Sequence, residues 1–368
     1  MKKFMLLCMV SFAVLNTEAQ PKFQLFSPDK TIRIEIQAIM RLKYSVFVDD
    51  KKILDESVIG IQLVDGRSLS QDLELVGSKE NQKREMIIAQ VPYNRKNIPD
   101  IYNELTLRFK NHFTIIFRAY DDGVAYRIST SFPDSIAVAQ ETAGFLFRKG
   151  GHAYAPLISK REGLDIFHTS FEETYLYKNL DSLSIKDFMF SPVLVKTSDD
   201  IFVALTESDL DDYPGMFLQG QGTDALRGAF AAYPLEEKIA DGEYPEKVVS
   251  KRANYIAKTK GTRSFPWRVM LIARQDKDLP ANDLVYRLAS PSTIKETDWI
   301  HPGKCTDEWI IDINLFNVPF RTGINTGSYK YYIDFAKRFG FNRIMMDAGW
   351  SDTKDLFKIS PALNMDTL

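Results

Sequence analysis

Apolar and polar residues alternate in short runs along most of the chain. Ile32-Arg33-Ile34-Glu35-Ile36 and Leu105-Thr106-Leu107-Arg108-Phe109 are clear examples. This period of two predicts strands that turn one face to a core. Similar runs occupy residues 113–120, 124–128, 202–205 and 267–272. Asp121-Asp122-Gly123 lies between two of them and predicts a hairpin, because Gly adopts positive φ at low cost. So many strands with hardly any helical period indicate a large β-sandwich over residues 20–290.

The pattern changes after Ala289, where prolines bracket a connector. Residues 309–313 then predict a strand. A helix is expected from the capping pair Asn325-Thr326 to Gly340, with apolar residues at helical spacing between them. Residues 343–347 predict a second, buried strand that ends at the carboxylate of Asp347. Strand, helix and strand form a βαβ unit, so residues 291–368 are expected to begin a (β/α) barrel that two strands cannot close.

The N-terminus has the pattern of a secretory signal peptide over residues 1–19. Lys2 and Lys3 are followed by an apolar run from Phe4 to Leu15 and by a small-residue site at Ala19. About a dozen apolar residues are too few for a membrane anchor, which needs roughly 20. Leu7 argues against a lipoprotein site at Cys8. We therefore expect an exported, periplasmic protein that is not held in the membrane after cleavage.

Composition narrows the possible partners and metal chemistry. The chain of 368 residues has a formal net charge of −2 and no basic tract, which argues against a nucleic-acid partner. It has two cysteines. Because Cys8 would leave with the signal peptide, Cys305 alone allows neither a disulfide framework nor a thiolate metal site.

Several segments, taken in order, resemble glycoside hydrolase family 97, which consists of periplasmic exo-acting α-glycosidases. Each is weak alone, but their order and spacing make the set specific. The segments are Tyr102-Asn103-Glu104-Leu105, residues 117–127, Ser170-Phe171-Glu172-Glu173-Thr174-Tyr175, residues 206–215, Phe265-Pro266-Trp267-Arg268, Pro302-Gly303-Lys304 and residues 331–350, which end with Asp347-Ala348-Gly349-Trp350. The resemblance implies an N-terminal β-super-sandwich that leads into a catalytic (β/α)8 barrel.

The resemblance also implies which chemistry to expect. Such enzymes hydrolyse α-linked galactosides or glucosides with two carboxylates, one as proton donor and one as nucleophile or base. In the family those residues lie on later barrel strands. No catalytic residue is therefore assigned in this chain; the catalytic carboxylates are expected downstream of Leu368, and the chain by itself is expected to be inactive. Asp347-Ala348-Gly349-Trp350 is more similar to the retaining branch, which includes α-galactosidases.

A calcium ion at the active site is a further implication of the resemblance. The matching ligand from the sandwich is Glu172, with Glu173 as the neighbouring alternative. A solvated surface carboxylate is the simpler interpretation of either residue. Calcium takes six to eight oxygen ligands, so most of the others would have to come from the barrel. Thr169 replaces a second ligand that relatives can have.

Five residues are candidates for binding the oligosaccharide substrate. Asp347 is expected to face the pocket from a strand end, where barrel enzymes place functional groups, and Trp350 could stack on a sugar. Glu308 and Trp309 belong to Asp307-Glu308-Trp309, which stands where relatives have Trp-Asp-Trp. Glu207 resembles a family acid near the domain interface, although an acid that caps the turn toward Gly215 explains it equally well.

Two other functions fit parts of the sequence. A carbohydrate-binding β-sandwich without hydrolytic activity would need only residues 20–290. An epimerase of the mutarotase type would need a His and Glu acid–base pair, and of the four histidines only His168 lies near a matching carboxylate, Glu172. The sugar, the stereochemical outcome and the oligomeric state are not predicted.

Overall fold

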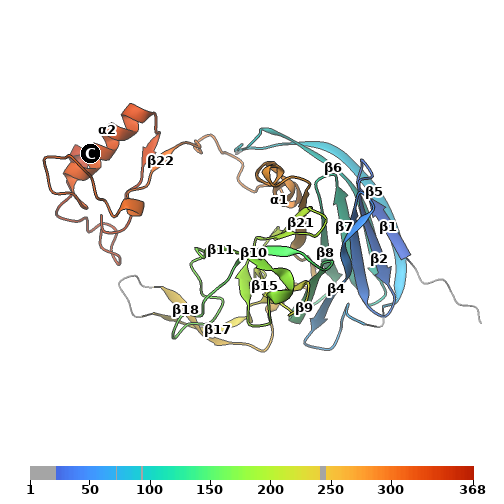
Figure 1. Cartoon of the computed structure of the whole chain (residues 1–368). Helices are drawn as coiled ribbons and strands as arrows, with labels where there is room; N and C mark the ends of the chain where they lie inside the picture. The colour runs from blue at the N-terminus through green and yellow to red at the C-terminus, as the bar shows by residue number, and fades with distance from the viewer. Residues whose placement is uncertain (1–21, 72, 93, 241–245) are drawn as a thin grey trace, which may run out of the picture.

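Two large antiparallel sheets form most of the protein, and Figure 1 shows them facing each other. The computed structural model describes residues 22–71, 73–92, 94–240 and 246–368, so the predicted signal peptide at residues 1–19 lies outside the described residues. In the part of the chain that is described, no helix is long and apolar enough to cross a membrane.

The first sheet has nine strands and begins with an N-terminal meander. Its order is β1 (Lys22–Phe26), β2 (Ile32–Ala38), β3 (Leu42–Val48), β4 (Lys51–Leu63), β9 (Ile136–Leu146), β16 (Ala225–Phe230), β15 (Met216–Gly220) and β12 (Phe188–Phe190), with β19 (Ala257–Thr259) also paired to β9. Buried and half-buried residues alternate strictly along β2. The strand predicted at residues 32–36 is therefore confirmed.

The second sheet has ten strands and contains the other predicted ones. Its order is β11 (Tyr175–Asn179), β10 (His152–Pro156), β13 (Val193–Lys196), β14 (Phe202–Ser208), β21 (Trp267–Ala273), β8 (Gly123–Ser131), β7 (Phe113–Tyr120), β6 (Asn97–Phe109) and β5 (Leu75–Ile88), with β20 (Thr262–Ser264) on β8. Apolar side chains from both sheets form one continuous core. β17 (Pro234–Ile239) and β18 (Lys247–Arg252) form a separate two-stranded sheet.

The short helix α1 (Leu284–Leu288) covers part of the second sheet's outer face. Leu284 and Leu288 pack with Tyr120, Trp267 and Val269 in a second apolar cluster. This cover explains why β8 begins with four buried residues in succession, in place of an alternating pattern.

Gly123 is needed because β21 and α1 come close to its backbone, and less because of the turn that the sequence predicted. It is the first residue of β8 and pairs with Tyr120 across the Asp121-Asp122 turn. A Cβ at this position would lie 2.5 Å from the Met270 carbonyl oxygen and 2.6 Å from Leu284 Cδ2. Asp122 accepts a hydrogen bond from Arg287 Nη2 at 2.6 Å, which ties the same turn to α1.

We expect Gly123→Ala to lower the free energy of unfolding by about 1–3 kcal/mol, because the methyl group would overpack the contact between β8, β21 and α1. Gly77→Ala on β5 is the matched control, since the added Cβ would have only Arg108 Nε nearby, at 4.0 Å. Urea unfolding of both variants measures the difference. Equal stability of the two variants would contradict the overpacking argument.

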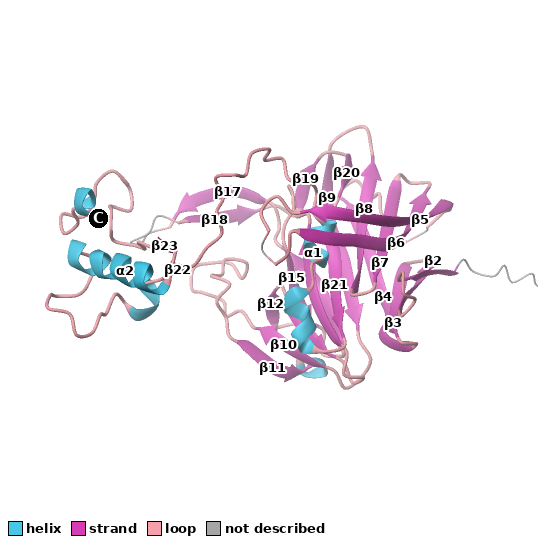
Figure 2. Ribbon diagram, turned by 90° about the horizontal axis from the view of Figure 1, so that it is seen from above, coloured by secondary structure: helices cyan, strands magenta, loops and turns pink. Residues whose placement is uncertain are grey.

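The C-terminal unit contains a βαβ arrangement and lies apart from the sandwich in both Figure 1 and Figure 2. β22 (Cys305–Thr306) and β23 (Arg343–Ile344) are parallel and flank α2 (Thr326–Phe339) in sequence. The predicted helix is confirmed with both of its caps. The Asn325 side chain accepts from the Ser328 N–H, and Gly340 is left-handed at the C-terminus.

The strand predicted at residues 309–313 is wrong. Residues Trp309–Ile311 form the 3-10 helix η3, and Asp312 and Ile313 have positive φ. The first strand of the unit is instead β22, four residues earlier. Asp307 Oδ1 accepts the Trp309 N–H at 3.2 Å, a local bond that favours a turn over an extended chain. Trp309 and Ile310 remain exposed, so no apolar layer holds this segment in a sheet.

The second predicted strand is shorter and less buried than expected. β23 contains only Arg343 and Ile344, and Met345 is 41% exposed. Its one paired neighbour within the described residues is the two-residue β22, which cannot cover a longer strand. The remaining 3-10 helices are η1 (Leu180–Ser182), η2 (Asp276–Ala281) and η4 (Met365–Thr367), the last of which is followed by Leu368.

Candidate functional site

Glu308 is fully buried where β22, α2 and β23 meet. It precedes η3, and its Oε1 accepts a hydrogen bond from the Tyr329 hydroxyl at 3.1 Å and from the Asp347 N–H at 2.7 Å. Tyr329 lies on α2, and Asp347 follows β23. The structure therefore brings together two of the predicted site residues, because the main-chain N–H of Asp347 donates to the side chain of Glu308.

The surroundings of Glu308 are polar as well as buried. Burial and then the Glu308 charge raise the pKa of Tyr329 well above its ordinary value. Glu308 Oε2 has no hydrogen-bond partner among the described residues, and the same holds for Thr306 Oγ1, Ser328 Oγ and the Tyr332 hydroxyl. Glu308 is thus enclosed among its neighbours and holds the main chain at Asp347.

The side chains around Glu308 are more accessible. Asp347 is half-buried, and its Oδ1 accepts the Ala348 N–H at 2.6 Å. Trp350 is also half-buried, whereas Trp309 is 62% exposed. Asp347, Trp350 and Trp309 thus remain available to a ligand at this end of the unit.

Glu207 lies elsewhere, in a buried ion triad that joins the two sheets. Glu207 on β14 pairs in register with Arg268 on β21, and Arg268 Nη1 donates to Glu207 Oε2 at 2.6 Å. Arg268 also donates from Nε and Nη2 to both oxygens of Glu141 on β9, at 2.7 and 2.8 Å. Arg268 and Glu141 are 1% and 4% exposed, and the Phe230 ring lies 4.8 Å from the guanidinium.

The triad places two carboxylates around one guanidinium away from water. Burial raises the pKa of Glu207, and the opposing effect of the Arg268 charge is smaller. Burial is the largest single effect on Arg268 and would lower its pKa, but the charge of Glu141, the hydrogen bonding to it and the charge of Glu207 together hold that pKa above its usual value. Glu207 Oε1 also accepts the Met216 N–H at 2.8 Å, directly after Gly215. This is the turn-capping role that the sequence left open for Glu207.

The predicted calcium ligands lie in the loop before β11. Glu172 is exposed and Glu173 half-buried. The loop is anchored by Phe171, which has a φ of 60° and packs against Phe190 with the ring centroids 5.3 Å apart. No group of three or more His, Cys, Asp or Glu able to hold a metal occurs among the described residues. Glu172 and Glu173 alone do not meet the six to eight oxygens that calcium needs.

The histidine considered for an epimerase mechanism has another carboxylate partner. His168 Nε2 lies 3.1 Å from Glu246 Oε2, just before β18. An acid–base pair of His168 with Glu172 is therefore not the arrangement that the structure describes.

The comparison with protein families settles the affiliation of the chain. The model for the glycosyl-hydrolase 97 N-terminal domain matches residues 25–291, and the glycoside hydrolase 97 model matches residues 309–368. The chain belongs to glycoside hydrolase family 97. A retaining α-galactosidase of Bacteroides thetaiotaomicron is 36% identical over 357 residues, which are 95% of this chain and 54% of that protein.

A second relative resembles the chain over a similar part of its own length. A probable retaining α-galactosidase of Streptomyces bingchenggensis is 24% identical over 84% of the chain and 43% of that protein. The chain thus spans about half the length of these relatives.

Two enzymes are among the solved structures that share the fold. A family 97 enzyme from a Pseudoalteromonas strain, in complex with acarbose, has a TM-score of 0.74 at 19% identity, over 94% of this chain and 51% of that one. A β-arabinopyranosidase has a TM-score of 0.68 at 22% identity, over 88% and 50%.

Sequence reasoning missed that Glu141 and Arg268 form one site with Glu207. Arg268 stood in the quoted segment Phe265-Pro266-Trp267-Arg268, and Glu207 in another. An arginine inside an apolar strand is itself a signal, because a buried charge needs a partner. Nothing local identifies Glu141, which is 127 residues away in the chain.

Proposed function

We propose that this chain provides the sandwich domain and the opening of the (β/α)8 barrel of a retaining, exo-acting α-glycosidase that acts on α-linked galactosides. The observation that carries the proposal is the 36% identity to a retaining α-galactosidase over 95% of the chain. The parallel β22 and β23 around α2 are what the start of such a barrel requires. α-Glucosides are the second substrate class of this proposal.

The proposal divides the work between this chain and the part of its relatives that it does not match. Asp347, with Trp350 and Trp309 beside it, would contact the sugar at the C-terminal end of β23. Glu308 would position Asp347 through its main chain. The proton donor and the nucleophile of a retaining mechanism, two carboxylates about 5 Å apart, would come from later barrel strands. Their location downstream of Leu368 stays a prediction.

The proposal also includes a bound calcium ion and a periplasmic location. Glu172 would reach over from the sandwich as one oxygen ligand, with the others supplied by the barrel. A bound calcium ion would add positive charge near the substrate. Export through a signal peptide at residues 1–19 would place the enzyme in the periplasm, where it would meet oligosaccharides.

Because the two catalytic carboxylates are assigned to other strands, we expect the chain alone to be inactive. The assay uses p-nitrophenyl α-D-galactopyranoside and α-D-glucopyranoside with calcium added, and a glycosidase of the same family as positive control. No release of nitrophenol above buffer is expected. Turnover that persists after repurification would contradict the placement of the chemistry outside this chain.

A further inference from the structure

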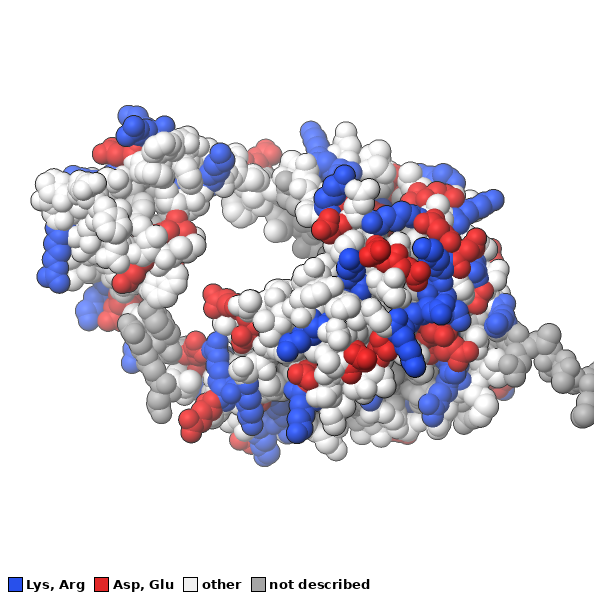
Figure 3. All heavy atoms as spheres, in the orientation of Figure 1, with Lys and Arg blue, Asp and Glu red and all other residues white. Residues whose placement is uncertain are grey.

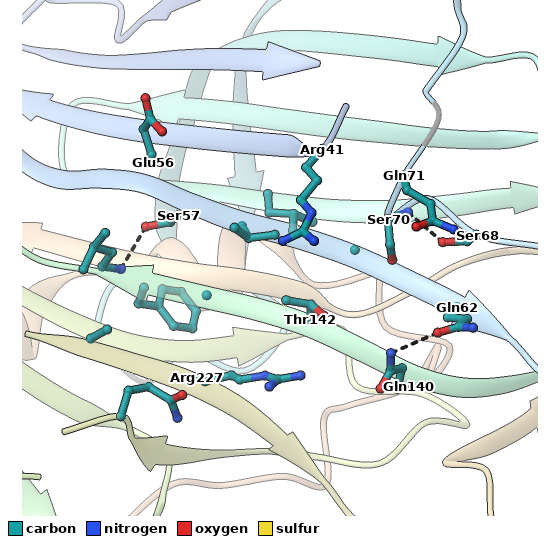
Figure 4. A pocket seen from close by; sticks show the side chains of 18 of the residues that line it. Arg41, Glu56, Ser57, Gln62, Ser68, Ser70, Gln71, Gln140, Thr142 and Arg227 are labelled. Atoms are coloured by element: carbon teal, nitrogen blue, oxygen red, sulfur yellow. Dashed lines mark hydrogen bonds between the residues drawn. The ribbon is translucent and has the colours of Figure 1, made fainter. Parts of the chain in front are cut away.

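A polar groove of about 610 Å³ crosses the outer face of the first sheet. It is far in sequence from Asp347 and is built from β4, β9 and β16 with the residues next to them. Its volume falls within the range of small-molecule sites. The charged and polar side chains that matter to the argument are Arg41, Gln62, Gln140, Thr142 and Arg227 (Figure 4).

Two arginines converge on the middle of this groove. Arg41 precedes β3, and Arg227 on β16 stands opposite Gly144 of β9 in the strand register. Figure 4 shows their guanidinium groups on either side of Thr142. Neither arginine has a carboxylate partner within the residues that the structure describes.

Charge pairing is common elsewhere on the sandwich surface. Figure 3 shows positive and negative side chains interspersed over the sandwich face in view. Arg67 and Arg274, for example, pair with Asp65 and Asp49. Among the described residues that line the groove, Glu56 is the one acid; it accepts a hydrogen bond from Lys43 at 2.7 Å, and this bond lowers the pKa of Glu56. The groove therefore carries an excess of positive charge.

The neutral side chains of the groove suit a sugar. Gln140 Nε2 donates to Gln62 Oε1 at 3.0 Å, a contact across β4 and β9 that leaves the other amide positions of both residues free for hydroxyl groups. Thr142 adds a hydroxyl between the two arginines. A guanidinium binds carboxylate in a two-pronged geometry and more strongly than it binds a neutral group.

We propose that this groove is a second carbohydrate site, which binds an acidic oligosaccharide by its carboxylates. Arg41 and Arg227 hold the carboxylates, and Gln62, Gln140 and Thr142 bind the hydroxyl groups of the same sugar. The site is separate from the proposed glycosidase centre, so its presence does not depend on whether that centre is active.

The test is calorimetric titration of the whole chain with an α-1,4-linked galacturonate trimer, a neutral galactose trimer and sodium sulfate. We expect saturable binding of galacturonate and at least about tenfold weaker binding of the other two, because a charge-assisted hydrogen bond contributes more than a neutral one. Equal binding of neutral sugar, or equal binding of sulfate, would overturn the proposal. No saturable binding of galacturonate would also overturn it.

Variants locate the site. Arg41→Gln and Arg227→Gln are each expected to weaken galacturonate binding about tenfold or more. Arg108→Gln is the matched control, since Arg108 is also exposed and without a carboxylate partner among the described residues, but lies on β6 of the other sheet. Unchanged thermal unfolding shows that each variant is folded. Full binding by a folded double variant at positions 41 and 227 would refute the assignment.

Discussion

Arg268→Met is expected to lower the free energy of unfolding by about 3–5 kcal/mol, because removing one partner of a buried ion pair leaves charge unpaired. Here two carboxylates, Glu141 and Glu207, would lose the guanidinium between them. Since β9 belongs to the first sheet and β14 and β21 to the second, the change loosens the contact between the sheets. Denaturant unfolding followed by tryptophan fluorescence measures the loss.

Two further variants separate the effect of the triad from that of losing any arginine. Arg268→Lys retains the charge but not the three-way hydrogen bonding, so an intermediate loss is expected. Arg274→Met removes an exposed pair with Asp49, and such pairs contribute about 0–1 kcal/mol. A loss at position 268 no larger than that at position 274 would show that the triad does not join the sheets.

Glu308→Ala is expected to leave the Tyr329 hydroxyl and the Asp347 N–H without their acceptor, at a cost of about 1–3 kcal/mol for each buried group. The pKa of the Tyr329 hydroxyl reports on the site locally. Without the Glu308 charge, the pKa of Tyr329 should move down toward its ordinary value. Ultraviolet absorbance titration and hydrogen exchange of residues 326–347 measure the two effects.

Asp307→Ala is the matched control for that variant. Asp307 is the preceding residue, is exposed, and bonds only to the local Trp309 N–H in the contacts described for it. It should change neither the Tyr329 titration nor the exchange of residues 343–347. If both variants behave alike, Glu308 is not the residue that positions Asp347.

Most strands of the sandwich could be predicted because the alternation of apolar and polar residues within a strand shows which of its faces is buried. An alternating strand such as β2 shows in its residues which face is inside, and the helix α2 carries its own caps in Asn325 and Gly340. Where a second element covers the outer face, as α1 covers β8, the alternation disappears and the reason is not local.

The errors concern segments whose neighbours decide their structure. Residues 309–313 have the composition of a strand. Trp309 and Ile310 are nevertheless exposed, because no apolar layer covers them, and they belong to the 3-10 helix η3. The burial of Glu308 and its hydrogen bonds from Tyr329 and Asp347 were not predicted either, whereas its contact with substrate stays a prediction. Arg268 and Glu141 come together only through the packing of two sheets, which no local pattern records.

The most direct test of the central proposal is a fusion of this chain, joined after Leu368, to the portion of the Bacteroides relative that it does not match. The fusion is assayed on p-nitrophenyl α-D-galactopyranoside with calcium. We expect hydrolysis, with α-galactose as the first anomer seen by NMR. The relative's portion alone, and a fusion that carries Asp347→Ala, should be inactive or strongly impaired. A folded fusion that hydrolyses no α-galactoside or α-glucoside would contradict the proposed function.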